Sequence, residues 1–330
     1  MKYLVIGCGS IGQRHIKNLK TLQPKSMIDV FDPQSKLLKH VCTKLKVTPA
    51  SKKSVKSTIY DCVLICTPPT THIQYAKEAI LSGSNVFIEK PISSSSNGIN
   101  PLLSLAKKKN TMVFVGYNLR FNKSICNIKK LLDSKRLGKP IHVSSYFGSY
   151  LPDWRPNQDY SKNYTARTNL GGGIIHDGSH ELDYLRYFFG NPKFIQSNYK
   201  KTKFLKSDTE ALVDIILEFD NELLGTIHLD YLRRQYKRTL EILFEHGIVE
   251  WSLSDSEIKL FNAKSKRWKK IKYPNSINEM YLDELKHVLK CLKTKTQSKI
   301  INLKNGVDTF LISEIIKKTQ RDSKVVNLRR

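Results

Sequence analysis

Between residues 2 and 119, short apolar runs alternate with stretches whose apolar positions recur at helical spacing. The apolar runs are bounded by glycine, proline or polar turns and cover residues 3–6, 27–31, 61–66, 85–88 and 112–115. The stretches between them place an apolar side chain every three or four residues, as at Leu38, Val41 and Leu45. Buried strands that alternate with amphipathic helices predict an α/β domain with a doubly wound parallel sheet.

The pattern changes beyond residue 121. A helical stretch at 125–132 is followed by strand-like runs that are joined by short turns. These runs cover residues 141–147, 194–200, 211–219, 223–232, 238–244, 248–253 and 258–261. They predict an α+β domain with an open, mainly antiparallel sheet and an intervening helix at 171–189.

Two helices near 277–294 and 306–319 and a short strand at 325–328 are expected to end the chain. The chain has 330 residues, of which 40% are hydrophobic, and this is enough for two separate cores. We therefore expect a first domain at residues 1–120 and a second at 121–330.

The first strand leads directly into a glycine pattern. Gly7, Gly9 and Gly12 form G-x-G-x-x-G between a predicted strand and a predicted helix. In that context Gly7 permits a tight turn, Gly9 leaves room for a pyrophosphate, and Gly12 lets the helix pack closely. The helix N-terminus offers free N–H groups to the phosphates. The pattern predicts a dinucleotide-binding Rossmann domain whose loop residues are Gly7, Gly9, Ser10, Ile11 and Gly12.

Asp32 ends the second predicted strand, 20 residues beyond Gly12. An acidic residue at this position accepts hydrogen bonds from the ribose hydroxyls and repels a 2′-phosphate. The expected cofactor is therefore NAD rather than NADP. The alternative is a glycine-rich turn followed by an unrelated aspartate.

Composition narrows the class of protein. No apolar run approaches the roughly 18 residues of a membrane span, and the N-terminus has no signal-peptide pattern. The six cysteines are scattered without a C-x-x-C pair, which favours reduced thiols and a cytoplasmic location. The net charge of +27 comes from lysines spread along the whole chain. Because this charge is not focused, it indicates a solvated surface, and we expect neither a membrane nor a nucleic-acid partner.

Lys90 follows another predicted strand, at residues 85–88. Ligands bind outside the carboxyl ends of parallel strands, so Lys90 is a candidate for the reaction site. A lysine there can hold a substrate hydroxyl and stabilise a developing alkoxide. The alternative is an ordinary surface lysine.

The stretch at 171–184 combines glycines with acidic residues and histidines. Its three consecutive glycines allow another backbone segment to approach closely. Asp177, His180 and Asp183 recur at spacings of three, which places them on one side of a helix. A carboxylate beside an imidazole orients the ring and raises its basicity, as a general base requires.

Two other interpretations of this stretch remain open. Asp177 could cap a helix, with His180 as a core histidine. Alternatively, His176 and His180, four residues apart, could bind a metal. The chain shows no motif for a third ligand, so no metal is expected.

The segment at 150–167 is rich in aromatic and basic residues. These side chains could stack on sugar rings and hold an acidic group, as a substrate lid would require. Alternatively, the segment could pack on its own domain or on a partner subunit.

Together these motifs resemble the Gfo/Idh/MocA family, the glucose–fructose oxidoreductase and inositol dehydrogenase type of enzyme. The resemblance covers nearly the whole chain. The matching segments, in family order, are residues 5–12, 31–33, 66–72, 89–91, 116–121, 171–184, 278–284 and 305–306. The E-K-P motif, combined with the glycine fingerprint and the later glycine–histidine stretch, makes the resemblance specific.

The resemblance implies an NAD(P)-dependent oxidoreductase that transfers a hydride between nicotinamide and a hydroxyl or carbonyl carbon. Its substrate would be a sugar, a sugar acid or a nucleotide-activated sugar. Lys90 and His180 would be catalytic, with Asp177 beside them. The cofactor would contact Gly7, Gly9, Ser10, Ile11, Gly12, Asp32, Thr67, Pro68, Pro69, His72, Glu89, Lys90 and Asn118. The substrate would contact Arg120, Trp154, Arg155, Tyr160, Tyr164, Arg167 and Asp183.

The chain departs from the commonest family pattern at one position. That pattern has the acid four residues before the catalytic histidine, whereas Asp177 lies three before His180. Members that resemble enzymes of bacterial surface-sugar clusters share this arrangement, which implies surface-glycan or nonulosonic-acid-type biosynthesis. The resemblance also implies a homodimer or homotetramer that is assembled through the second domain. A non-catalytic, NAD-sensing regulator on the same fold is the alternative, and retention of Lys90 and His180 favours the enzyme.

Overall fold

The computed structural model describes residues 1–273 and 276–319, and the chain forms two compact units. The first unit contains residues 1–122 and 276–308, and the second contains residues 123–273 and 309–319. The sequence predicts a boundary after residue 120, and the first segment of the first unit ends at residue 122. Residues 276–308, however, pack with the first unit. The strand expected at 325–328 lies outside the described residues.

The first unit is built on a parallel six-stranded sheet with the order β3-β2-β1-β4-β5-β6. Its strands are β1 (Lys2–Ile6), β2 (Met27–Phe31), β3 (Thr48–Pro49), β4 (Cys62–Ile65), β5 (Asn85–Glu89) and β6 (Val113–Gly116). All five pairings are parallel. The predicted doubly wound sheet is confirmed. The short strand β3 was not predicted, because its two exposed residues carry no apolar run.

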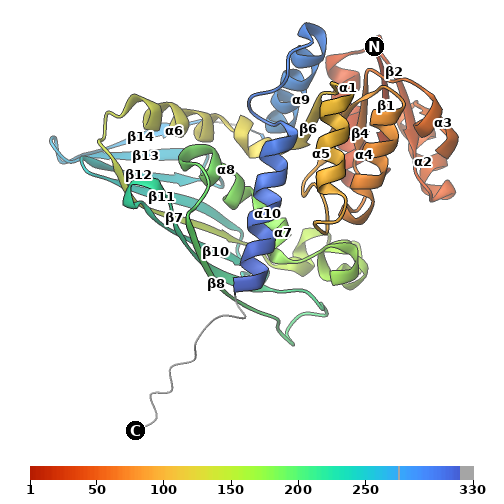
Figure 1. Cartoon of the computed structure of the whole chain (residues 1–330). Coiled ribbons are helices and arrows are strands. Elements are labelled where there is room, and N and C mark those ends of the chain that lie inside the picture. The colour runs from red at the N-terminus through yellow and green to blue at the C-terminus, as the bar shows by residue number, and fades with distance from the viewer. Residues whose placement is uncertain (274–275, 320–330) are drawn as a thin grey trace. The chain divides into compact units, whose positions relative to one another are not determined.

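Helices connect the strands of this unit and pack against the sheet (Figure 1). They are α1 (Ser10–Leu22), α2 (Ser35–Leu45), α3 (Lys52–Ser57), α4 (His72–Leu81), α5 (Ile99–Lys108) and α9 (Ile277–Thr294). Helix α1 buries Ile16 and Leu19 completely. Its Asn18 side chain exchanges hydrogen bonds with Asn278 of α9. This contact shows how α9, far along the chain, belongs to the first unit.

The second unit is built on an eight-stranded sheet with the order β14-β13-β12-β11-β7-β10-β9-β8. Its strands are β7 (Pro140–Gly148), β8 (Phe194–Lys200), β9 (Leu212–Glu218), β10 (Leu224–Asp230), β11 (Lys237–Phe244), β12 (Gly247–Ser252), β13 (Glu257–Asn262) and β14 (Arg267–Lys272). Only the β7–β10 pair is parallel, so the mainly antiparallel sheet is confirmed. Strand β14 was not predicted, because charged residues dominate it. Charged side chains are common on such edge strands.

The two faces of this sheet differ in their surroundings. On β9, Val213, Ile215 and Leu217 are buried, whereas Ile216 between them is 43% exposed. The buried face is covered by α6 (Lys123–Ser134) and α8 (Ser179–Phe189) (Figure 1). The opposite face, which we call the open face, carries the exposed side chains.

The helix predicted at 171–189 is in fact two helices. Helix α7 (Ile174–Asp177) ends at Gly178, and α8 begins at Ser179. A Cβ atom on Gly178 would lie 2.7 Å from Leu229 of β10, so this glycine allows the helices to turn close to the sheet. The prediction that Asp177, His180 and Asp183 share one side of one helix is therefore wrong. Helix α10 (Leu303–Thr319) begins slightly before the expected residue 306.

Within the described part of the chain, no helix combines the length and apolar character that crossing a membrane requires. All six cysteines are free thiols, as the sequence predicts.

Candidate functional site

The loop after β1 has the geometry of a phosphate cradle. Gly7 adopts a positive φ of 103°, and a Cβ atom there would lie 2.7 Å from the Cys66 carbonyl oxygen. A Cβ on Gly12 would lie 1.9 Å from the Gly7 carbonyl oxygen, so α1 packs closely only because this residue is glycine. At Gly9, by contrast, an added Cβ would meet no atom within 4 Å. The space beside Gly9 is open, and the pyrophosphate of a dinucleotide fits this opening.

The beginning of α1 suits a negatively charged group. Ser10 and Ile11 form its first turn, which contains no acidic residue. The unpaired N–H groups and the helix dipole there favour an anion. The positive end of the helix dipole and the open space beside Gly9 therefore both suit a phosphate group.

Asp32 lies directly after β2 and is 9% exposed. One carboxylate oxygen accepts a hydrogen bond from the Cys8 N–H at 2.7 Å, and the other accepts one from the Gln34 N–H at 2.8 Å. These bonds fix the carboxylate beside the glycine loop and leave each oxygen a lone pair for a ribose hydroxyl. Burial, aided by the charge of Asp32, raises the pKa of the Cys8 thiol to about 12, so this thiol stays protonated. The residues present fit an NAD cofactor.

The loop after β4 contains Thr67, Pro68 and Pro69 and leads into α4, which begins at His72. His72 is 1% exposed. Its Nε2 lies 2.7 Å from the Thr67 carbonyl oxygen, and its Nδ1 lies 2.9 Å from the Pro91 carbonyl oxygen. His72 thus joins two loops from inside the unit.

Lys90 follows β5 at the sheet edge that also carries the glycine loop and the Thr67 loop. It is partly exposed, whereas Glu89 before it and Pro91 after it are buried. The Glu89 carboxylate lies 2.7 Å from Nε2 of His15 in α1. The structure places Lys90 where ligands bind in parallel sheets.

Asn118 and Arg120 lie in η2 (Asn118–Phe121), directly after β6. Asn118 is 5% exposed and Arg120 is 4% exposed. The Arg120 guanidinium donates a hydrogen bond to the Ile300 carbonyl oxygen of the same unit. The roles of both residues in ligand binding remain predictions.

In the second unit, Asp177 is 5% exposed and is held by two tyrosines. Oδ1 accepts a hydrogen bond from the Tyr164 hydroxyl at 3.2 Å, and Oδ2 accepts one from the Tyr231 hydroxyl at 2.6 Å. Burial and the nearby charge of Asp177 raise the pKa of Tyr231 well above its ordinary value. Tyr231 therefore remains a donor at neutral pH. The residue preceding α8 is Gly178, so Asp177 does not cap that helix.

His180 is the second residue of α8 and is partly exposed. His176 is 1% exposed, and its Nδ1 lies 3.0 Å from the Gly171 carbonyl oxygen. Nε2 of His176 lies 3.1 Å from the Lys317 ammonium and 3.4 Å from the Glu314 carboxylate. Across residues 1–273 and 276–319, no group of three histidine, cysteine or acidic side chains could hold a metal ion.

The three consecutive glycines permit the close backbone approach that the sequence predicts. A Cβ on Gly172 would lie 2.0 Å from the Tyr164 carbonyl oxygen. The Gly173 N–H donates a hydrogen bond to the Thr165 carbonyl oxygen at 3.1 Å. This packing brings the Tyr164 segment to Asp177.

The remaining side chains of the 150–167 segment are placed in different ways. The Trp154 indole N–H donates to the Ser149 hydroxyl at 2.8 Å, and its ring meets Tyr231 edge-on at 5.4 Å. The Tyr160 hydroxyl accepts a hydrogen bond from the Lys206 N–H. These contacts show part of the segment packing on its own unit.

Three further side chains that the sequence predicts to contact the substrate are Arg155, Arg167 and Asp183. Arg155 is partly exposed, and Arg167 lies 4.0 Å from Asp208. Asp183 is 1% exposed and accepts a hydrogen bond from Thr309. Their roles in substrate binding remain predictions.

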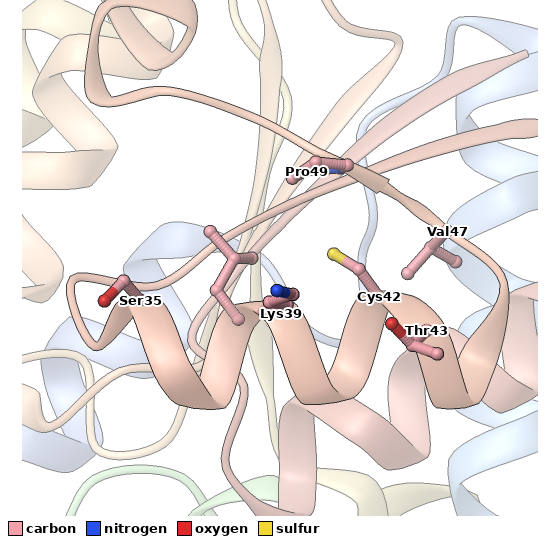
Figure 2. A pocket seen from close by; sticks show the side chains of 7 residues that line it. Ser35, Lys39, Cys42, Thr43, Val47 and Pro49 are labelled. Carbon is pink, nitrogen blue, oxygen red and sulfur yellow. The ribbon is translucent and has the colours of Figure 1, made fainter.

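A hollow of about 420 Å3 lies beside α2 and β3, and none of the residues that line it is a predicted site residue. Figure 2 shows Ser35, Lys39 and Cys42 of α2 and Pro49 of β3 around it. Burial raises the pKa of the Cys42 thiol, so the hollow offers no reactive thiolate. It contains no chemistry that would make it the reaction site.

Sequence reasoning did not find Tyr231 or His15. Tyr231 follows β10 and lies 54 residues from its partner Asp177. His15 lies on the buried side of α1, next to Ile16. A polar residue on the apolar side of a helix is the one signal that could have identified His15.

Comparison with known proteins agrees with this geometry. Residues 1–117 match the family of oxidoreductases with an NAD-binding Rossmann fold, and residues 125–250 match the GFO/IDH/MocA C-terminal domain. The chain is 24% identical to myo-inositol 2-dehydrogenase from Thermotoga maritima, over 99% of this chain and 98% of that protein. It is 26% identical to scyllo-inositol 2-dehydrogenase (NAD(+)) from Bacillus subtilis, over 88% and 85% of the two chains.

Solved structures share the fold. Levoglucosan dehydrogenase in complex with NADH and levoglucosan has a TM-score of 0.88 at 15% identity, over 98% of this chain and 97% of that one. UDP-N-acetylglucosamine 3-dehydrogenase from Acidithiobacillus ferrooxidans has a TM-score of 0.79 at 16% identity, with 97% of each chain covered. The chain belongs to the Gfo/Idh/MocA family of NAD-dependent oxidoreductases.

Proposed function

We propose that this protein transfers a hydride between NAD and a hydroxyl or carbonyl carbon of a sugar, a sugar acid or a nucleotide-activated sugar. The observation that carries the proposal is the position of Lys90, which shares one sheet edge with the open glycine loop and the fixed Asp32 carboxylate. Inositol dehydrogenases among the relatives support a polyol or sugar hydroxyl as the reacting group.

In the proposed reaction, bound NAD supplies the hydride acceptor. His180 takes the proton of the substrate hydroxyl, as a general base does. The Lys90 ammonium stabilises the negative charge that develops on the substrate oxygen. Asp177 supports the base, and the hydroxyls of Tyr164 and Tyr231 keep its carboxylate in one orientation.

The substrate side of the proposal rests on the segment at 150–167. Trp154 and Tyr164 supply aromatic surface, and Arg155 and Arg167 supply positive charge for an acidic group. We place the reaction in surface-glycan or nonulosonic-acid-type sugar biosynthesis, on the basis of the pattern D-x-S-H-E-L-D at residues 177–183, which resembles enzymes of bacterial surface-sugar clusters. The six free thiols support a cytoplasmic location.

We also propose that the open face of the eight-stranded sheet forms a homodimer or homotetramer. Phe194, Ile216 and Leu224 lie on three adjacent strands and are 43–49% exposed. The strand register puts them on one face, around Glu218. Large apolar side chains grouped on an uncovered sheet favour self-association.

The test is turnover by the purified protein. NAD+ and a panel of inositols, aldoses, uronic acids and nucleotide sugars are offered, and NADH formation is followed by absorbance. The proposal expects NADH with at least one member of the panel. NADH binding without turnover of any substrate, in either direction, would instead favour the non-catalytic NAD sensor.

A further inference from the structure

A lysine side chain is long and flexible, so the position of the Lys90 ammonium group depends on how firmly the surrounding backbone is held. The residues on either side of it are each tied to a buried histidine. Before it, the Glu89 carboxylate lies 2.7 Å from His15. After it, the Pro91 carbonyl oxygen lies 2.9 Å from His72.

The contact of His15 with Glu89 is almost completely shielded from water. His15 is 0% exposed, and its ring meets Phe87 edge-on at 5.1 Å. The other carboxylate oxygen lies beside Gly116, where an added Cβ atom would be 3.3 Å from it. Removing one partner of such a buried polar pair leaves the other unsatisfied, so the pair resists rearrangement.

The contact of His72 ties together two loops. Its Nδ1 faces Pro91 and its Nε2 faces the Thr67 carbonyl oxygen at 2.7 Å. An imidazole places two polar nitrogens on opposite sides of one rigid ring, and a leucine of similar volume has neither. A neutral imidazole carries one N–H and donates to one of these carbonyl oxygens at a time, while the ring itself lies between the two loops. Any shift of the Lys90 segment away from the Thr67 loop would therefore disturb the buried packing around this ring.

Both histidines also lie on helices that begin at the sheet edge where the cofactor is proposed to bind. His15 is on α1, three residues beyond Gly12 of the glycine loop. His72 opens α4, directly after the Thr67 loop. The Lys90 backbone is thus linked on one side to the phosphate-binding helix and on the other to the neighbouring loop.

We propose that His15 and His72 are positioning residues that hold Lys90 in register with the bound dinucleotide. This inference rests on the proposed function, in which Lys90 contacts the substrate beside the cofactor. The alternative is that both histidines only stabilise the fold, without acting through Lys90.

The first experiment measures how bound NADH shields Lys90. The full chain is treated with acetic anhydride with and without NADH, and acetylation of each lysine is quantified by peptide mass spectrometry. We expect NADH to slow acetylation of Lys90 in the wild type, and this protection to fall about tenfold in His15→Leu and His72→Leu. Lys107, on α5, serves as the internal reference. His40→Gln, which alters an exposed histidine of α2, is the matched control and should retain wild-type protection.

The outcomes separate the two proposals. Full protection of Lys90 in the wild type and in both leucine variants would overturn the positioning role while leaving the proposed function intact. Absence of protection in the wild type would overturn both, because Lys90 would not lie beside the cofactor. If a leucine variant does not fold, His72→Gln and Glu89→Gln retain part of the contacts and replace it.

A mutant cycle provides the second experiment. With a substrate from the panel, His15→Gln is expected to lower kcat about 10- to 100-fold while NADH affinity changes less than about threefold. In a Lys90→Met background the same change should lower kcat no further, because the histidine acts through Lys90. An equal further loss in that background would show a general structural effect and overturn the positioning role.

Discussion

Replacing Gly9 with alanine probes the cofactor loop without disturbing the protein. The backbone of Gly9 has φ −65° and ψ −175°, which alanine adopts readily. An added Cβ would meet no atom within 4 Å, so the free protein should keep its stability or gain up to about 1 kcal/mol. A bound pyrophosphate, however, would have to share that space with the new methyl group.

The size of the effect follows from what the methyl group displaces. If it separates the pyrophosphate from the loop, at least one charge-assisted hydrogen bond is lost, worth about 1.5–3 kcal/mol. At about 1.4 kcal/mol per tenfold, NADH should bind about 10- to 100-fold more weakly. Fluorescence titration with NADH measures the affinity, and thermal denaturation without NADH measures the stability.

Gly12→Ala provides the contrast. Its Cβ would lie 1.9 Å from the Gly7 carbonyl oxygen, and backbone atoms cannot move aside as a side-chain tip can. This variant should lose about 3 kcal/mol of stability in the absence of any cofactor. A Gly9→Ala protein that binds NADH as tightly as the wild type would refute the placement of the pyrophosphate at this loop.

Three further predictions concern specificity, pH and assembly. Because the fixed Asp32 carboxylate repels a 2′-phosphate, NADH should bind at least about tenfold more tightly than NADPH, and equal affinities in a titration would contradict this reasoning. Hydrogen bonding to Asp230 raises the pKa of His228, so this pair stabilises the fold below the unfolded pKa of about 6.5 and loses that contribution as pH rises through the folded pKa. The difference in melting temperature between wild type and His228→Gln should therefore shrink from about pH 6 to about pH 9, and a constant difference would contradict the assignment. Ile216→Glu combined with Leu224→Glu should convert the assembly to monomers by light scattering, whereas a wild type that is monomeric at micromolar concentration would remove the open-face proposal.

The local periodicity of the chain predicted most of the fold. Strands β2 and β8 lie at the expected residues, because each combines apolar positions with clear turn residues at its ends. Strand β14 escaped prediction because its charged residues suit a sheet edge rather than a core. The break at Gly178 escaped because its cause is Leu229, a neighbour that is distant in the sequence.

The candidate site shows the same division between local and distant causes. The glycine loop and Lys90 could be located because strand ends are visible in the sequence and ligands bind there. The partners of these residues could not, since the His15–Glu89 contact spans 74 positions and the Asp177–Tyr231 contact spans 54. Spacing in the sequence identifies candidate reactive side chains. The side chains that orient them are distant in the sequence, so only the folded structure shows which ones they are.

The central claim is tested most directly by the turnover of four single variants with a substrate that the wild type oxidises. His180→Ala should lower kcat by about 10²–10⁴ with NADH affinity nearly intact. Lys90→Arg should fail to restore what Lys90→Ala loses, because a planar guanidinium cannot replace a compact ammonium. His176→Ala should be mild and insensitive to chelator, whereas a metal site would make it match His180→Ala. A His180→Ala protein that retains most of the wild-type kcat would contradict the account and leave His180 with a structural role in the second unit.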